Sequence, residues 1–326
     1  MGAWHPGAMR TVTAAGLTVS AIGLGCWQFG SREWGYGEGY AQGVAGDIVG
    51  RALDLGVTLL DTAEAYGFGK SERIVGAALA ERRDEAVVAT KLFPILPLPP
   101  VVANRGQASA RRLGIDTIDL YQVHQPNPAV PDRVIMPGMR RLHDLGRIAH
   151  VGVSNYSLAR WQAAEEALGA PVVSNQVEYS LVQRKPEREL LSWAQSNDRL
   201  IIAYSPLAQG LLGARYGPDN RPGGVRALNP HFTPESLEES AELLEALRRT
   251  AKAHDATPAQ VSLAWLLHHP NVVAIPGASS VAQLEHNAAA ADLDLTDEEV
   301  RELDELSSAY RPAGIGTVVK SFMRRG

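Results

Sequence analysis

The sequence has a single cysteine, Cys26, so it cannot form an intrachain disulfide. It has no run of about eighteen apolar residues, the usual length of a membrane-spanning helix. The N-terminal segment MGAWHPGAMR also has no apolar stretch typical of a secretory signal. The 31 Lys and Arg residues are offset by 36 Asp and Glu residues, which argues against nucleic acid or an anionic membrane as a partner. We therefore expect a cytoplasmic protein.

The chain does contain enough apolar residues for a large core, since 45% of its 326 residues are hydrophobic. No internal repeat or low-complexity linker divides it, so we expect one domain over residues 1–326. Met9 is an alternative start, which would leave residues 1–8 as an irregular extension.

Short apolar runs alternate with amphipathic, helix-like segments along most of the chain. This alternation favours βα units around a parallel sheet. Eight such units are the number needed for a closed (β/α)8 barrel, the TIM barrel of the α/β class. The eight runs begin at Ala21, Val57, Ala86, Ile118, His150, Pro171, Leu200 and Asn271.

Three additions to a plain barrel are expected. Residues Arg10 to Ser20, with Gly16 at the turn, predict an N-terminal β-hairpin that closes the barrel bottom. The connection from Pro206 to Pro234, after strand 7, is too long for an ordinary βα loop and predicts a functional loop. Two extra helices are expected, from Pro258 to His268 and from Thr296 to Ser308.

Each apolar run ends on a residue that a core does not need. In a (β/α)8 barrel the carboxyl ends of the strands form the active-site face, so these side chains should converge at one mouth. They are Trp27, Asp61, Lys91, His124, Asn155, Gln176, Tyr204 and Gly277.

Four residues near the ends of the second, third and fourth strands are chemically complementary. A tyrosine has a pKa of about 10, and a nearby ammonium lowers that pKa and makes the phenol a usable proton donor. Lys91 can supply the ammonium to Tyr66, and Asp61 can keep Lys91 charged in a desolvated site. His124 can then orient a carbonyl or relay the proton. Taken singly, each of these residues also has an ordinary structural role, but the combination predicts a catalytic site.

At this point the chain resembles the aldo-keto reductases, in particular the branch of the potassium-channel β subunits and related bacterial enzymes. The resemblance rests on GLGCWQFG, LLDTAEAYG, VVATK, IDLYQVH, GVSNY, NQVEYS, AYSPLAQGLL and IPGASS, in the family's order. It implies NAD(P)H-dependent, metal-independent reduction of an aldehyde or ketone, with Tyr66 as general acid. Asp61 and Lys91 tune the tyrosine, and His124 positions the carbonyl.

A hydride source is also needed, because no side chain supplies one. No dinucleotide fingerprint follows a strand, so a Rossmann domain is not expected. The resemblance implies instead an extended nicotinamide dinucleotide across the barrel mouth.

The polar groups at the later strand ends suit this cofactor. Ser154, Asn155 and Gln176 match the donors and acceptors of a carboxamide, and Tyr204 can stack on the nicotinamide ring. Backbone amides that lead into the helix near Val281 can meet phosphate. Gln283 and Asn287 can contact adenosine or be an exposed polar stripe. The predicted cofactor set is Trp27, Ser154, Asn155, Gln176, Tyr204, Ser205, Pro206, Leu207, Gly210, Arg215, Arg226, Gly277, Ser279, Gln283 and Asn287.

We expect NADPH to be preferred, with NADH bound less well. Many family members have lysine or arginine after the IPG segment, whereas this chain has Ser279 and Ser280, which weakens the expectation. Arg215 and Arg226 in the long loop can fold over the pyrophosphate, or they can be solvated surface residues.

The expected substrate pocket contains Trp27, Trp34, Tyr66, His124 and Gln125. Aromatic walls suit an aldehyde or ketone with an apolar or flat part, although the same aromatics can pack beneath their loop. Gln125 stands where many relatives have tryptophan, which makes the pocket more polar. Sugar ketones, quinones, aryl aldehydes and α-dicarbonyls are all compatible substrate classes. The sequence does not specify the favoured direction of the reaction. It also does not specify the oligomeric state, and a homo-oligomer is one of the options.

Two other functions compete with a reductase. The segment GASSVAQLEHN resembles the cofactor segment of the potassium-channel β subunits, so the alternative is a nicotinamide-nucleotide sensor with slow turnover. A barrel isomerase or lyase that uses Lys91 as a Schiff base is disfavoured, because Asp61 and Tyr66 have a clearer purpose beside a charged lysine.

Overall fold

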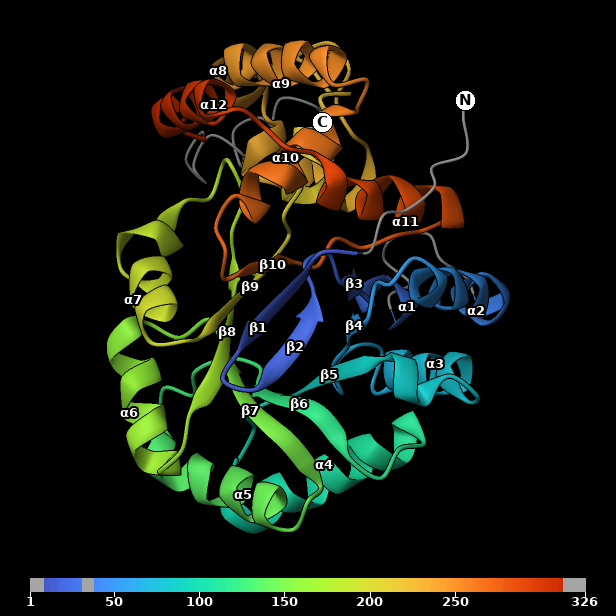
Figure 1. Ribbon diagram of the computed structural model, residues 1–326, viewed down its shortest axis with the longest axis vertical. Coiled ribbons are helices and arrows are strands. Elements are labelled where there is room, and N and C mark those ends of the chain that lie inside the picture. The colour runs from blue at the N-terminus through green and yellow to red at the C-terminus, as the bar shows by residue number, and fades with distance from the viewer. Residues whose placement is uncertain (1–8, 31–37, 313–326) are drawn as a thin grey trace, which may run out of the picture.

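The chain forms a ring of parallel strands surrounded by helices (Figure 1). The computed structural model describes residues 9–30 and 38–312. The predicted extension over residues 1–8 lies outside these ranges. Within them, no helix has the length and apolarity required to cross a bilayer.

The eight barrel strands pair in chain order in one parallel sheet. The two outer strands then meet, because Gly23 and Gly25 donate backbone hydrogen bonds to Ala274 and Pro276. The predicted (β/α)8 barrel is therefore confirmed. The strands are β3 Leu24–Gly25, β4 Leu59–Asp61, β5 Val87–Leu92, β6 Ile118–Val123, β7 Ile148–Ser154, β8 Val172–Glu178, β9 Leu200–Tyr204 and β10 Val272–Ala274.

The predicted hairpin is also confirmed, with β1 Thr11–Ala14 paired antiparallel to β2 Leu17–Ser20. Ala15 and Gly16 both have positive φ, as the turn of a tight hairpin requires. Ala15 bonds to Asp198 just before β9, and Ser20 accepts hydrogen bonds from Thr58 and Leu59 at the start of β4. The hairpin therefore covers the amino-terminal end of the barrel, and it crosses the middle of the ring in Figure 1.

Helices follow the strands and pack on one another around the outside. Their buried faces and the buried side chains of the strands form one apolar core. The helices are α1 Trp27–Gly30, α2 Glu38–Asp54, α3 Lys70–Leu79, α4 Pro99–Leu113, α5 Asp132–Asp144, α6 Leu158–Leu168, α7 Leu190–Ser196, α8 Pro234–Glu239, α9 Ala241–Ala253, α10 Pro258–Leu267, α11 Val281–Ala288 and α12 Asp297–Ala309.

Both predicted extra helices are present as α10 and α12, and each begins with a capping box. The role of α10 differs from the prediction of a helix additional to the barrel, because α10 packs against β10 and is a barrel helix. The sequence analysis did not predict α9, which packs on α10 and α12 outside the barrel. The long connection after β9 is confirmed, and it contains the short 3-10 helices η3 Ala208–Gly213, η4 Gly224–Leu228 and η5 Pro230–Phe232.

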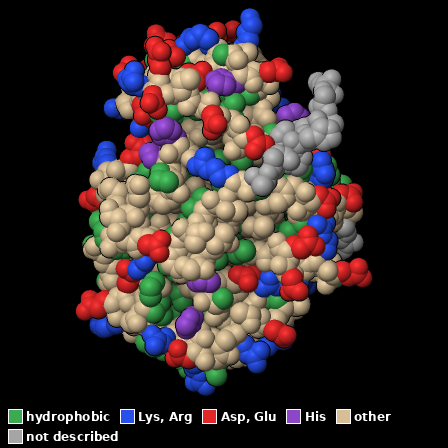
Figure 2. Space-filling view, in the orientation of Figure 1, with side chains coloured by type: hydrophobic (Ala, Val, Ile, Leu, Met, Phe, Trp, Pro, Cys, Tyr) green, Lys and Arg blue, Asp and Glu red, His purple; other side chains and the backbone are tan. Residues whose placement is uncertain are grey.

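Charged side chains do not gather into a large patch of one sign on the face drawn in Figure 2. Acidic and basic groups are mixed there and concentrate toward its edges. This distribution fits the nearly balanced composition of the chain.

Candidate active site

The ends of β4 and β5 bring the predicted acid, lysine and phenol together. Lys91 is fully buried, and its Nζ lies 2.5 Å from Asp61 Oδ1 and 2.8 Å from the carbonyl oxygen of Thr62. The same Nζ lies 3.3 Å from Tyr66 Oη. Its three protons thus have three oxygen partners, and one of these is the phenol.

The electrostatics of this group follow from burial and from the ion pair. Burial alone would lower the pKa of Lys91, but Asp61 and Tyr66 outweigh it and the net shift is upward. Lys91 is therefore charged, as the sequence analysis expected. Burial raises the pKa of Tyr66, and the opposing effect of Lys91 is smaller. The predicted net lowering of the Tyr66 pKa was wrong, because burial has a larger effect than Lys91, and Tyr66 is protonated at neutral pH.

His124 follows β6 and stands edge-on to Tyr66, with 5.7 Å between the ring centroids. Burial, reinforced by Lys91, lowers the pKa of His124 to about 3. The imidazole is therefore neutral and carries one N–H, and its Nδ1 is buried with no hydrogen-bond partner among the described residues. All four predicted residues meet at one place.

The segment DTAEAYG turns sharply after β4 so that Tyr66 points back toward Lys91. Gly67 has φ +59°, a region in which a side chain is strained. A Cβ on Gly67 would also stand 3.0 Å from the Cα of Gly30. The glycine that ends this segment is therefore needed for both its backbone angle and its close contact.

Glu64 and Phe93 belong to the site, although the sequence analysis did not name them. Glu64 Oε1 accepts a 2.6 Å hydrogen bond from the backbone N–H of Phe93, and its carboxylate pairs with Arg105. Phe93 in turn packs edge-on against His124 at 5.9 Å between centroids. Glu64 thus ties the loop of Tyr66 to the loop that follows Lys91. The sequence offered only their positions as a signal: Glu64 lies two residues before Tyr66, and Phe93 lies two residues after Lys91.

The predicted carboxamide-binding residues lie at the ends of β7, β8 and β9. Asn155 has φ +61°, and it donates to Ser154 Oγ while accepting from the Tyr204 hydroxyl, each at 3.1 Å. Its backbone N–H bonds to Gln176 O. Gln176 Nε2 donates to Asp61 Oδ2 at 2.7 Å, so this amide contacts the acid of the catalytic group.

The predicted phosphate end is a short loop before α11. Gln283 Oε1 accepts from both the backbone N–H and the hydroxyl of Ser279, and Asn287 Nδ2 donates to Gly277 O. Gln28 from α1 braces the same loop through the carbonyl of Ala278. In this structure Gln283 and Asn287 therefore shape the loop itself.

The long loop carries the remaining predicted cofactor residues. Arg226 contacts the hydroxyl of Tyr216 within the loop, and Arg215 is exposed. Tyr216 packs on the buried ring of Phe232, which anchors the loop. Ser205, Pro206, Leu207 and Gly210 form its first turn, in which Ser205 and Gly210 have positive φ.

The chain matches a known protein family along most of its length. The model of the aldo/keto reductase family matches residues 21–308. The chain belongs to this family. An uncharacterized oxidoreductase of Mycobacterium tuberculosis is 60% identical over 306 residues, which cover 94% of this chain and 95% of that protein.

Solved structures of aldo-keto reductases have the same fold. The glycerol dehydrogenase of Gluconobacter oxydans matches with a TM-score of 0.84 at 30% identity, covering 93% of this chain and 97% of that one. An aldo/keto reductase of Klebsiella pneumoniae, in complex with NADP and acetate, matches with a TM-score of 0.75 at 31% identity. That match covers 94% of this chain and 96% of the other.

The mouth of this aldo-keto reductase barrel has an apolar rim. Trp27, Phe68 and Leu96 follow β3, β4 and β5, and they are 43%, 95% and 72% exposed. Phe68 and Leu96 also have positive φ, an uncommon backbone for bulky residues. Gln125 is exposed beside His124, whereas the predicted pocket residue Trp34 lies outside the described residues.

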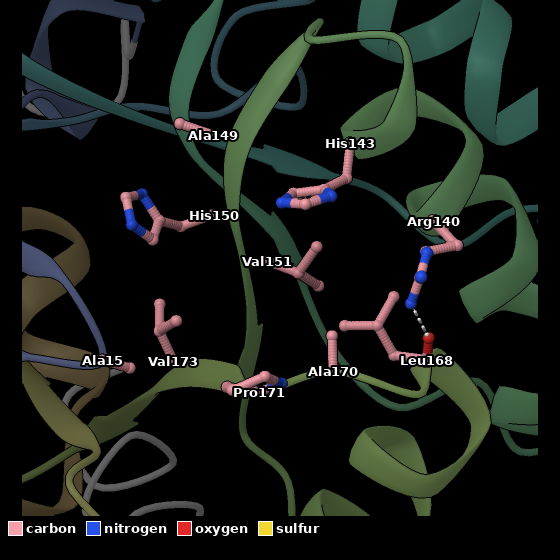
Figure 3. A pocket seen from close by; sticks show the side chains of 10 residues that line it. All are labelled: Ala15, Arg140, His143, Ala149, His150, Val151, Leu168, Ala170, Pro171 and Val173. Atoms are coloured by element: carbon pink, nitrogen blue, oxygen red, sulfur yellow. Dashed lines mark hydrogen bonds between the residues drawn. The ribbon is translucent and has the colours of Figure 1, made fainter.

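A separate hollow of about 270 Å³ lies at the other end of the barrel (Figure 3). Its walls come from the starts of β7 and β8, from α5 and from the hairpin turn at Ala15. Its polar groups already have protein partners: Arg140 pairs with Asp144, and His150 Nδ1 contacts the carbonyl of Asp119. It is distinct from the mouth, since Ser154 and Gln176 lie toward the opposite ends of the same strands.

Proposed function

We propose that this chain reduces an aldehyde or ketone to the alcohol, with NADPH as hydride donor and Tyr66 as general acid. The observation that carries the proposal is the contact of one buried ammonium, Lys91 Nζ, with both Asp61 and Tyr66. A charged lysine beside a phenol stabilises the phenolate that remains after proton donation.

The residues divide the reaction among them. Tyr66 Oη gives its proton to the carbonyl oxygen as the alkoxide develops, and Lys91 stabilises the phenolate. Asp61 keeps Lys91 charged. Neutral His124 directs a single N–H or lone pair toward the substrate, because its pKa of about 3 keeps it unprotonated. The nicotinamide supplies the hydride when bound, since no side chain can.

The residues present fit a nicotinamide carboxamide. Asn155 is exposed, is held in a left-handed backbone conformation, and joins Ser154 and Tyr204 in one hydrogen-bonded chain beside Gln176. Such strained positions cluster at ligand sites. The choice of a nicotinamide dinucleotide is supported by the NADP complex of the Klebsiella protein. The two serines Ser279 and Ser280, in place of a lysine or arginine, argue for only a moderate preference for NADPH over NADH. The exposed apolar rim supports substrates with an apolar or aromatic part.

Titration of tryptophan fluorescence with NADPH and NADH, followed by absorbance at the NADPH band after a panel of carbonyls is added, tests the proposal. We expect NADPH to bind more tightly than NADH and to be consumed with at least one aldehyde, ketone or quinone. Tight binding without consumption of any carbonyl would favour a nucleotide sensor. Absence of binding by both nucleotides would overturn the proposal.

A further inference from the structure

Gln122 is a buried amide near the carboxyl end of β6 that contacts Asp61. It is 0% exposed, and its Nε2 lies 3.3 Å from Asp61 Oδ2. Gln176 donates to the same oxygen at 2.7 Å, and Lys91 occupies Oδ1. Asp61 is thus held by two amides and one ammonium, of which Gln122 had no role in the sequence analysis.

The register of the sheet shows how Gln122 reaches this position. Lys91, Gln122, Gly152 and Ser174 are partners in one row across β5, β6, β7 and β8. A Cβ on Gly152 would stand 2.9 Å from Gln122 Cγ and would overlap Ser174 Oγ. Gly152 therefore leaves the space in which the Gln122 side chain lies beneath the ion pair.

Packing alone does not explain an amide at this place. Gln122 Oε1 is buried and has no hydrogen-bond partner among the described residues, and such a group carries a desolvation penalty. Leucine or methionine would fill the row without that penalty. The feature that an apolar residue cannot reproduce is the N–H directed at Asp61.

We propose that Gln122 is a positioning residue that holds the Asp61 carboxylate oriented toward Lys91. An N–H donated to a carboxylate favours its ionised form, and an ionised Asp61 keeps Lys91 charged beside Tyr66. This inference rests on the proposed reductase chemistry. Gln176 is also the predicted partner of the cofactor carboxamide, so Gln122 is the amide that serves Asp61 alone.

Two substitutions separate this role from packing. Gln122→Met keeps the approximate length and removes the donor, so it should lower kcat about 10-fold to 100-fold at every pH, as a misplaced catalytic group does. The KM for the carbonyl and the Kd for NADPH should stay within about twofold, since the groups that hold the ligands are unchanged.

Gln122→Glu keeps the shape but makes the donor depend on pH. A protonated carboxyl can donate to Asp61, whereas an ionised one repels it. The other titratable groups of this cluster are Lys91, Tyr66 and Cys26, and His124 lies two residues after Gln122, just beyond β6. The kcat of Gln122→Glu should approach the wild-type value near pH 5.5 and fall progressively below it toward about pH 8, as the raised pKa of the introduced carboxyl is passed. A structural role would not produce this pH dependence.

Stability gives a second measurement that needs no turnover. Beside Asp61 the introduced carboxyl has a folded-state pKa above its unfolded value of about 4.3, so its contribution is present at low pH and lost as pH rises. The urea midpoint of Gln122→Glu should therefore fall relative to wild type between about pH 5 and pH 8. If the wild type reduces no carbonyl, the proposed function fails, while this measurement still tests the contact with Asp61.

Ser174→Ala is the matched control, because Ser174 is buried in the same row and its Oγ has no hydrogen-bond partner among the described residues. It should retain the wild-type pH profile. The inference is overturned if Gln122→Met keeps wild-type kcat, or if the kcat and urea midpoint of Gln122→Glu follow the wild-type pH dependence. If Gln122→Glu does not fold, the kcat of Gln122→Met decides alone: a lowered kcat supports the inference and a wild-type kcat overturns it.

Discussion

Asp61 and Lys91 form an ion pair inside the barrel mouth, with 2.5 Å between Oδ1 and Nζ and side-chain exposures of 3% and 0%. Transfer of two charges into such an interior costs free energy that their attraction only partly offsets. The additional bonds to Thr62, Gln122 and Gln176 satisfy their remaining donors and acceptors. The pair is therefore explained better by its contact with Tyr66 than by stability.

Removal of one partner should destabilise the fold strongly. Lys91→Met leaves the Asp61 carboxyl without its cation, and we expect a loss of about 3–5 kcal/mol in the free energy of unfolding at neutral pH. Urea denaturation measures this loss. Addition of Asp61→Asn to Lys91→Met removes the unpaired charge. The double variant should therefore recover much of the lost free energy of unfolding. Additive losses from the two substitutions would show that the residues are not coupled.

Tyr66→Phe removes the proposed proton donor and little else. We expect kcat for carbonyl reduction to fall about 10²-fold to 10⁴-fold, the usual range for general acid catalysis. The Kd for NADPH should stay within about twofold, because the proposed cofactor contacts are elsewhere. Steady-state kinetics and fluorescence titration measure the two quantities. Loss of nucleotide binding together with activity would place Tyr66 in the cofactor site instead.

The buried imidazole of His124 should make stability depend on acid. Its pKa of about 3 lies below the value of about 6.5 in an unfolded chain, so the unfolded state takes up the proton first as pH falls. Stability from this group is complete above about pH 7 and is lost progressively toward pH 3.

His124→Gln provides the comparison, since His231 and His269, whose pKa values are also lowered by burial, are present in both proteins. The wild type should lose more of its unfolding free energy than the variant between about pH 7.5 and pH 4.5. Urea midpoints across this range measure the difference, and parallel curves would show that His124 does not resist protonation.

Gly152 provides a packing test. Gly152→Ala places a methyl group against Gln122 and Ser174, and overpacking of this kind costs about 1–3 kcal/mol. Gly46→Ala, in α2 with open space at its Cβ, is the matched control and should stabilise by about 0.5–1 kcal/mol. Thermal or urea unfolding measures both. A stable Gly152→Ala variant would mean that the row has more room than its geometry indicates.

The fold was predictable because alternation of apolar runs and helical segments is a local property of the chain. The exceptions were local as well. The strand expected through Trp27 ends at Gly25, since Cys26 N–H bonds to Asp61 O and the chain turns into α1. The helix α9 was overlooked, although Leu243, Leu244, Leu247 and Ala251 recur at helical spacing and are buried.

The grouping of Asp61, Tyr66, Lys91 and His124 was predictable because strand ends of a barrel share one face. Contacts between distant side chains were not. Glu64 reaches Phe93, and Gln122 reaches Asp61, across loops and strands whose register no local pattern specifies. The net pKa of Tyr66 was also beyond sequence reasoning, because it depends on how completely the folded chain buries the phenol.

The hairpin closes the amino-terminal end of the barrel. It caps the end opposite Tyr66, where Ala15 and Ser20 are bonded to the starts of the strands. The hydrogen bonds that close the barrel and the group around Tyr66 therefore lie at opposite ends of the same strands, so a substitution in the hairpin can change stability without contact with that group.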